Sequence, residues 1–323
     1  MPRYRILVFI TFFYLACCQN VENDAINLEM DQSPDSLEVF AAHMVSTALY
    51  ERDMAISPSG DMIVYTLGNH KQTRRCLVAM EKMETGWSTP EILPISGIHQ
   101  DIEPFFTPDG KRLYFASNRP INQDSSRNDY NIWYTDKLAG GWNPPVALDT
   151  LINTRGDEFY PSISSEGNLY FTATRNNGLG LEDIFRSETS NGVFQKPIPL
   201  DSAINSTKYE FNAYISPAED LIIFSSYGRS DGLGGGDLYF STKSDNGNWM
   251  KAKNMGALVN SEKLDYCPFV DWERNNFYFT SDRAAVPEHR LTSVTELVDI
   301  SNSILNGHGN IFRVSLERLH LGQ

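Results

Sequence analysis

Five acidic residues recur in a repeated pattern, each six positions before a short turn motif: Glu51, Asp101, Glu158, Glu210 and Asp265. A ring of such carboxylates could hold a cation or a sugar, and two of them could hydrolyse a glycosidic bond as acid and base or nucleophile. Alternatively, each carboxylate accepts hydrogen bonds from backbone N–H groups or pairs with an arginine of its own repeat. We favour the second interpretation, because every repeat needs the same structural contact whereas catalysis needs asymmetry.

Further polar residues lie in the loops that share a face with these acids, and they are candidate ligand contacts: Arg119, Arg127, Arg175, Arg229, Asp231, Asp237 and Arg283. The glycine-rich segment 229–237 could coordinate Ca²⁺ through its two aspartates. Its spacing matches no known calcium loop, which favours a tight turn. The six histidines form no metal-binding spacing and no GxSxG motif is present, so we predict no other metal or cofactor and no catalytic residue.

The elements that position these residues are β-strands in five copies. Each copy contains a strand, a turn rich in Pro, Gly, Ser and Asp, and a second apolar strand such as Leu113-Tyr114-Phe115. Turn anchors at 57, 107, 164, 216 and 271 are separated by 50, 57, 52 and 55 residues. Third and fourth strands recur as well, and a period of this length with four strands predicts an all-β propeller.

The fifth copy lacks its outer strand, and the missing strand is found at the other end of the chain. Residues 37–45 have the pattern of an outer strand with no blade before it. Pairing it with the fifth copy would close the ring and remove an exposed edge. We therefore predict five four-stranded blades closed by an N-terminal strand, with six blades as the alternative.

The repeats, above all FTPDGKRLYFASNR at 106–119, resemble the WD40-like propeller repeats of the TolB type over about residues 37–316. They lack the Trp-Asp signature of WD40 repeats, and TolB itself has six blades. The resemblance implies a periplasmic or outer-membrane protein that binds without catalysis.

The N-terminus predicts export. Arg3 and Arg5 precede the apolar run 6–15, and Ala16 precedes Cys17, which is typical of a signal peptide over 1–16. A cysteine at this point resembles the bacterial lipoprotein signal, which implies acylation of Cys17 and a membrane-anchored protein facing the periplasm or the cell surface. Acylation of Cys18 and secretion without a lipid are the alternatives. Residues 17–36 are polar and predict a flexible tether, with the propeller domain over 37–323.

Charge and composition narrow the function. A formal net charge of −14 repels phosphate backbones, so we expect no nucleic-acid partner. We predict a non-catalytic binding or scaffold module that recognises a protein, peptide or glycan of the envelope through loops such as 119–130 and 284–309, the second with a short amphipathic helix as a lid or as packing. The alternative is a glycoside hydrolase that uses the central carboxylates.

Overall fold

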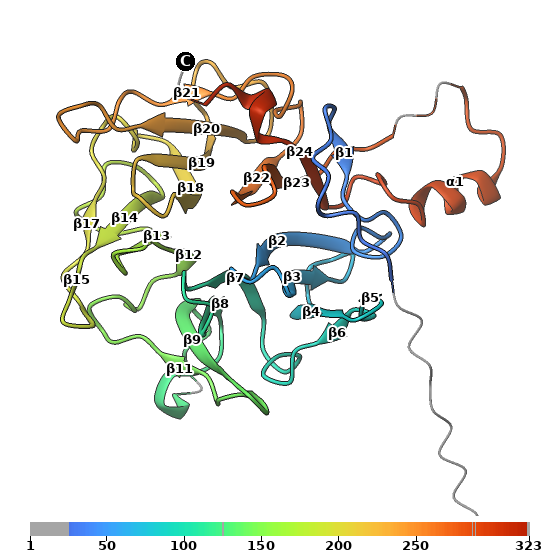
Figure 1. Cartoon of the computed structure of the whole chain (residues 1–323). Helices are drawn as coiled ribbons and strands as arrows, with labels where there is room; N and C mark the ends of the chain where they lie inside the picture. The colour runs from blue at the N-terminus through green and yellow to red at the C-terminus, as the bar shows by residue number, and fades with distance from the viewer. Residues whose placement is uncertain (1–25, 125, 286, 288, 322–323) are drawn as a thin grey trace, which may run out of the picture.

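The chain forms a five-bladed β-propeller (Figure 1). The computed structural model describes residues 26–124, 126–285, 287 and 289–321. Within them, five antiparallel sheets surround a common axis, each with its first strand innermost. The prediction of five blades is confirmed, and the six-bladed alternative does not apply.

Each blade takes its strands in chain order from the axis outward, except for the last strand of blade 5. Blades 1 and 2 each have five strands. Blade 1 has β2 (Tyr50–Ile56), β3 (Met62–Gly68), β4 (Arg75–Met83), β5 (Gly86–Trp87) and β6 (Glu91–Ile92), and blade 2 has β7 (Asp101–Phe106), β8 (Arg112–Ser117), β9 (Asn131–Leu138), β10 (Gly141–Trp142) and β11 (Val146–Ala147).

Blades 3, 4 and 5 each have four strands. Blade 3 has β12 (Glu158–Ile163), β13 (Leu169–Ala173), β14 (Asp183–Ser187) and β17 (Ile198–Pro199), with the small hairpin β15 (Thr189–Ser190) and β16 (Val193–Phe194). Blade 4 has β18 (Tyr209–Ile215), β19 (Leu221–Tyr227), β20 (Asp237–Thr242) and β21 (Lys253–Asn254), and blade 5 has β22 (Asp265–Asp271), β23 (Asn276–Ser281), β24 (Asn310–Ser315) and β1 (Glu38–Val39).

Strand β1 closes the ring as predicted. It pairs antiparallel with β24, with Glu38 opposite Arg313 and Val39 opposite Phe312, and the N–H of Phe40 continues the pairing to the carbonyl of Ile311 at 2.8 Å. The first and last parts of the propeller therefore share one sheet, in which the short β1 covers the outer edge of β24.

The predicted turn anchors are side chains that fold the turn between the first and second strands. The hydroxyl of Ser216 accepts the N–H groups of Asp220 and Leu221 at 3.1 and 3.0 Å, and Ser57 does the same in blade 1. In blade 5 a carboxylate, Asp271, takes this position and accepts the N–H of Arg274. We call the end of the ring with these turns the hairpin face, and the opposite end, where the inner strands begin, the connector face.

Apolar layers fill the space between neighbouring blades, and each layer takes side chains from both blades. The layer between blades 5 and 1 also contains Leu28 and Met30, which are buried. The flexible tether predicted for 17–36 therefore does not hold for residues 26–36, because two apolar side chains in this polar stretch enter the core. Residues 1–25, including Cys17 and the predicted signal peptide, lie outside the described residues.

Three short helices complete the described chain: η1 (Ile121–Gln123), α1 (Val294–Ser301) and η2 (Leu316–Leu319). The insertion with α1 leaves blade 5 at the connector face, and in Figure 1 the helix lies outside the outline of the ring. No helix in the described part of the chain is long and apolar enough to cross a membrane.

Candidate functional site

The five predicted carboxylates lie at or near the start of the five inner strands, and all are fully buried. Glu210 shows the pattern: it accepts hydrogen bonds from the backbone N–H and the hydroxyl of Ser206, each at 2.7 Å, and from the hydroxyl of Ser226 at 2.9 Å. In the other four blades the hydroxyl of a Ser or Thr of the preceding connector also donates to the acid: Thr47 to Glu51, Ser96 to Asp101, Thr154 to Glu158 and Ser261 to Asp265. We call these five acids the carboxylate ring.

Arginines from the loop between the second and third strands complete this contact in four blades. Arg229 pairs with Glu210 at 2.9 Å, donates to the carbonyl of Ile204, and lies over the rings of Phe224 and Tyr239. The other three predicted arginines of this position repeat the arrangement: Arg119 with Asp101, Arg175 with Glu158 and Arg283 with Asp265. These side chains point into their own blades, where they join the loop to the connector.

Blade 1 departs from this pattern because it has no arginine at this position. Its acid, Glu51, instead accepts a hydrogen bond from Asn310 at 3.2 Å. Burial raises the pKa of Glu51, and it raises the pKa of Glu158 to about 7 although Thr154 and Arg175 oppose this effect. An acid and a base of a glycosidase must face one substrate, whereas each of these carboxylates contacts its own connector. The geometry gives no support to glycoside hydrolysis by the carboxylate ring.

The remaining candidate residues also make local contacts. Arg127 pairs with Asp129 and donates to the carbonyl of Thr154. Asp237 accepts the N–H of Leu233 at 2.7 Å, and Asp231 accepts the hydroxyl of Tyr239 at 2.9 Å, so the glycine-rich segment is a closed turn. No group of three or more His, Cys, Asp and Glu side chains within the described ranges could hold a metal ion. Calcium binding in this loop stays a prediction.

A second polar set, which was not predicted from the sequence, lies two residues after each ring acid. Each inner strand bulges at this point, and the bulged residue has a positive φ between 49° and 60°. The five bulged residues differ in every blade, and together with Arg52 they form what we call the axial cluster: Arg52, Asp53, Glu103, Tyr160, Asn212 and Cys267.

Contacts between blades that are not neighbours place this cluster on the axis. Glu103 of blade 2 accepts a hydrogen bond from Asn212 of blade 4 at 3.1 Å. Tyr160 of blade 3 donates its hydroxyl to the carbonyl of Pro268 of blade 5 at 3.0 Å. Because side chains of the cluster cross the ring in this way, they close the channel at the level of the bulges.

The cluster contains two buried acids and one cation. Arg52 bonds to Asp53 at 2.7 Å and to Glu103 at 2.9 Å, and lies over the ring of Tyr266. Burial raises the pKa of Glu103 to about 7, against the opposing effect of Arg52, and burial also raises the pKa of the Cys267 thiol. Asp53 and Glu103 are 1% and 3% exposed, so this acid pair is closed off from a substrate.

Glu103 also supplies a hydrogen-bond acceptor that one blade lacks. In three blades the N–H of the bulged residue donates to a threonine of the preceding blade: Asp53 to Thr280, Glu103 to Thr66 and Asn212 to Thr172. The equivalent position in blade 2, which would accept the N–H of Tyr160, is Ala116, and its side chain has no hydroxyl. The carboxylate of Glu103 accepts this N–H instead, at 2.7 Å.

One sequence signal for the axial cluster was available. Proline follows the bulged residue in three of the five inner strands, as Pro104, Pro161 and Pro268. Proline inside a strand marks a bulge, because it cannot donate to the ladder. The contacts themselves had no signal in the sequence, since Glu103 and Asn212 are 109 residues apart.

Below the axial cluster the ring opens on the hairpin face. A cavity of about 300 Å³ takes residues from all five blades. Phe105, Tyr214 and Phe269 form an aromatic wall, with ring centroids 6.2 and 5.9 Å apart. Its rim consists of exposed residues at the start of four turns: Pro58, Pro108, Pro217 and Trp272. We call this cavity the axial mouth.

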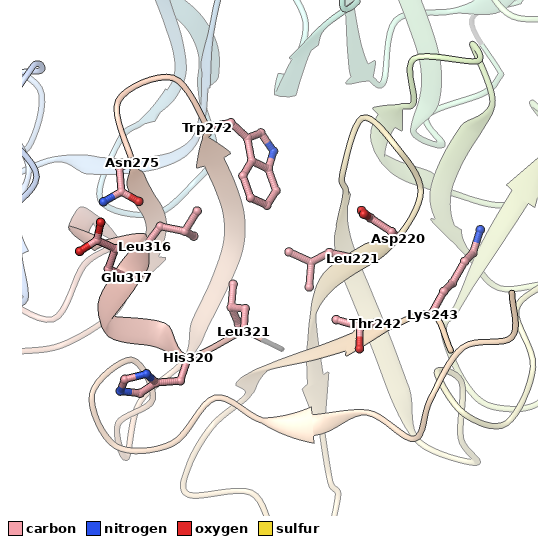
Figure 2. Close-up of a pocket in the computed structure, with 10 residues that line it drawn as sticks. All are labelled: Asp220, Leu221, Thr242, Lys243, Trp272, Asn275, Leu316, Glu317, His320 and Leu321. Carbon is pink, nitrogen blue, oxygen red and sulfur yellow. The ribbon is translucent and has the colours of Figure 1, made fainter. Parts of the chain in front are cut away.

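Trp272 stands where three other blades have proline, and it is 46% exposed. Its indole N–H donates to the hydroxyl of Tyr214 at 2.8 Å, which fixes the ring at the rim. The same tryptophan lines a cleft of about 590 Å³ between blades 4 and 5, where Figure 2 shows it projecting into the space across from Leu221. The other walls of the cleft include Lys243 of blade 4 and His320 near the C-terminus.

The predicted amphipathic helix exists as α1, but none of its residues enters the core. The hydroxyl of Ser293 accepts the N–H of Glu296 at 3.1 Å, and the Glu296 carboxylate accepts the N–H of Thr292 at 2.9 Å, so the first turn is capped at both groups. None of its eight residues is buried, and Val294, Leu297 and Val298 are 78%, 52% and 48% exposed. The helix is therefore neither a lid over the channel nor part of the core.

Comparison with known proteins identifies no family for this chain. No protein-family model and no curated protein matches the chain. Among solved structures, a candidate TolB from Agrobacterium tumefaciens is 15% identical with a TM-score of 0.48, over 77% of this chain and 78% of that one. The GH43 endo-arabinanase from Bacillus licheniformis is 11% identical with a TM-score of 0.47, over 87% of this chain and 96% of that one. The five-bladed fold rests on the strand pairing of this chain, and the function must be argued from its own residues.

Proposed function

We propose that this protein is a non-catalytic binding propeller of the bacterial cell envelope, exported and held at a membrane by a lipid on Cys17, which recognises a partner protein from its connector face. The observation that carries the proposal is α1, a capped helix at the edge of that face with an unburied aliphatic stripe. An isolated helix of eight residues is marginal in water, so its caps and its flanking loop must hold it in place.

The stripe follows helical geometry. Val294, Leu297 and Val298 are three and four positions apart, so their side chains lie on one side of the helix. Burying such aliphatic side chains stabilises a complex by roughly 1.5–3 kcal/mol each when burial is complete. Aliphatic groups offer neither the aromatic faces nor the hydrogen bonds that hold sugars, which favours a protein partner over a glycan.

The carboxylate ring supports this function indirectly. Four arginine–carboxylate pairs tie the loops of the connector face to their connectors. Loops fixed at their roots lose less conformational freedom on binding, so more of the contact energy remains as affinity. The ring thus makes the connector face a rigid base for α1 and for the loop 119–130.

The test is cross-linking of the acylated protein in intact cells, followed by identification of what is attached. We expect a defined partner that is lost from the double variant Leu297→Asp and Val298→Asp. The matched control is Val193→Asp, since Val193 is 55% exposed in the outer hairpin of blade 3, away from α1. Equal recovery of the partner by all three proteins would contradict the role of α1.

The lipid has its own test. Metabolic labelling with a fatty-acid analogue should be abolished by Cys17→Ala. Persistent labelling would move the anchor to Cys18, and absence of label in the wild-type protein would mean secretion without a lipid.

A further inference from the structure

The segment that leads from the N-terminus to the propeller is fixed to the hairpin face. Ile26 pairs with Trp87 through two backbone hydrogen bonds of 2.8 and 2.7 Å, and Trp87 lies at the hairpin end of blade 1. Seven residues further, the hydroxyl of Ser33 donates to the carbonyl of Arg274 in the turn of blade 5, at 2.7 Å. We call residues 26–36 the strap.

Polar side chains of blade 5 hold the strap along its length. Arg274 pairs with Asp31 at 3.3 Å, Asn276 donates to the carbonyl of Met30 at 3.2 Å, and Arg313 donates to the carbonyl of Glu29. Leu28 and Met30 are buried between the blades, as described above. These contacts come from the hairpin ends of blades 1 and 5, so the strap cannot reach the connector face without leaving the core.

The position of the strap limits where a membrane anchor can lie. Eight residues, 18–25, separate Cys17 from Ile26. Fully extended, this length of chain spans about 30 Å. An anchor on Cys17 therefore stays within that distance of the hairpin end of blade 1.

The hairpin face also has surface chemistry that suits a lipid interface. Trp272 and the rings of Pro58, Pro108 and Pro217 are exposed around the axial mouth. The indole N–H of Trp272 already has a partner in Tyr214, so its ring can enter an apolar surface without leaving a donor unpaired. Tryptophan is enriched where proteins meet the membrane–water interface.

We propose that the hairpin face lies against the lipid surface of the membrane that carries the anchor, with Trp272 and the proline rim at the level of the headgroups. This inference rests on the proposed lipid at Cys17. It directs the connector face, with α1 and the loop 119–130, away from the membrane and toward partners. The full sequence has a formal net charge of −14 and becomes more acidic when Arg3 and Arg5 leave with the signal peptide, so anionic lipid repels the protein and the contact weakens as anionic lipid is added.

The experiment measures which face is near the lipid. Acylated protein is reconstituted into phosphatidylcholine vesicles that contain a headgroup spin-labelled lipid, in a Cys18→Ser and Cys76→Ser background. A fluorophore is placed on the hairpin face through Pro108→Cys or, as the matched site on the connector face, through Leu179→Cys. We expect at least threefold stronger quenching at position 108 than at position 179, and a ratio close to one after Trp272→Asp.

Two readouts test the orientation of the propeller separately from the acylation of Cys17. Mass spectrometry of the reconstituted protein reports acylation of Cys17 directly. A second arm replaces residues 1–17 with a histidine tag bound to a nickel-chelating lipid, so that the tether starts at the same place in a protein that carries no acyl group. Equal quenching at the two positions in this arm, or stronger quenching at position 179, would overturn the orientation, whereas a missing acyl group would overturn only the anchor.

Discussion

Two sets of buried polar residues lie two positions apart on the same five inner strands. The carboxylate ring has an acid in every blade, and a Ser or Thr of the connector contacts each acid. The axial cluster has a different bulged residue in every blade: Asp53, Glu103, Tyr160, Asn212 and Cys267. The inner strand therefore has an acid at the first of these positions in all five blades and a different residue at the second position in each blade.

The two positions differ in where the hydrogen-bond partners of their side chains lie. A ring acid satisfies donors of its own connector, and these donors recur in each blade, so one residue type solves the problem everywhere. The bulged residues meet one another at the axis, where five equal acids would repel and five equal apolar groups would leave the N–H of Tyr160 without the carboxylate that accepts it. One cation, two acids and an amide satisfy each other only as an unequal set.

The largest effect is expected at the axis. Arg52→Met removes the cation between Asp53 and Glu103 and leaves two buried acids without a counter-ion. Breaking a buried pair in this way costs about 3–5 kcal/mol of unfolding free energy. Urea unfolding at pH 8 measures the loss.

Its control is the exposed pair of Lys111 and Asp109, at 3.8 Å. Lys111→Met should change stability by less than about 1 kcal/mol, because water screens this pair. If both variants lose the same stability, the axial cluster is not the ionic centre that its geometry implies.

The next largest effect concerns the carboxylate ring. Glu210→Ala removes the acceptor of Ser206 and the partner of Arg229, and should cost about 2–3 kcal/mol. Glu158→Ala should cost the same within about 1 kcal/mol, because blade 3 repeats these contacts. Guanidinium unfolding of both variants checks this equality, and a large difference between them would show that the ring is not a repeated structural device.

How much of the fold and of the candidate site could be predicted depends on how far apart in the sequence the contacting residues are. The five blades follow from turn chemistry and apolar runs within 60 residues, and the pairing of β1 follows from a missing strand. The arginine–carboxylate pairs join residues about 20 positions apart, so the structural interpretation of Glu210 was accessible from the sequence.

The remaining features depend on contacts across the ring. Leu28 and Met30 stand in a polar stretch, and only their contact with the layer around Trp87 makes them core residues. Helix α1 has the periodicity of a packed helix, but periodicity does not say whether a surface is there to cover it. The role of Glu103 depends on the hydroxyl that Ala116 lacks, and this lack is seen only when the second strands of several blades are compared.

A pH dependence of about 2 kcal/mol is expected from Glu158. Burial raises its pKa to about 7 from 4.5 in the unfolded chain, so between these values the folded protein holds a proton that the unfolded chain has released. The resulting stability is fully present below pH 4.5 and is lost as the pH rises through 7. Relative to Glu158→Gln, which cannot titrate, the wild-type protein should lose stability between pH 5 and pH 8. A constant difference between the two proteins over this range would contradict the raised pKa.

The smallest effect is the sharpest test of the axial cluster. Ala116→Thr restores the hydroxyl that Thr66, Thr172 and Thr280 supply in three other blades. In the wild-type protein Glu103 already accepts the N–H of Tyr160, so the new hydroxyl should bring no gain. In a Glu103→Ala background that N–H is left unpaired, and the threonine should recover about 1 kcal/mol. Thermal unfolding of the four proteins gives the coupling energy of this cycle. A coupling of zero would mean that Glu103 does not substitute for the missing hydroxyl, and the asymmetry of the cluster would then need a cause other than the vacancy at Ala116.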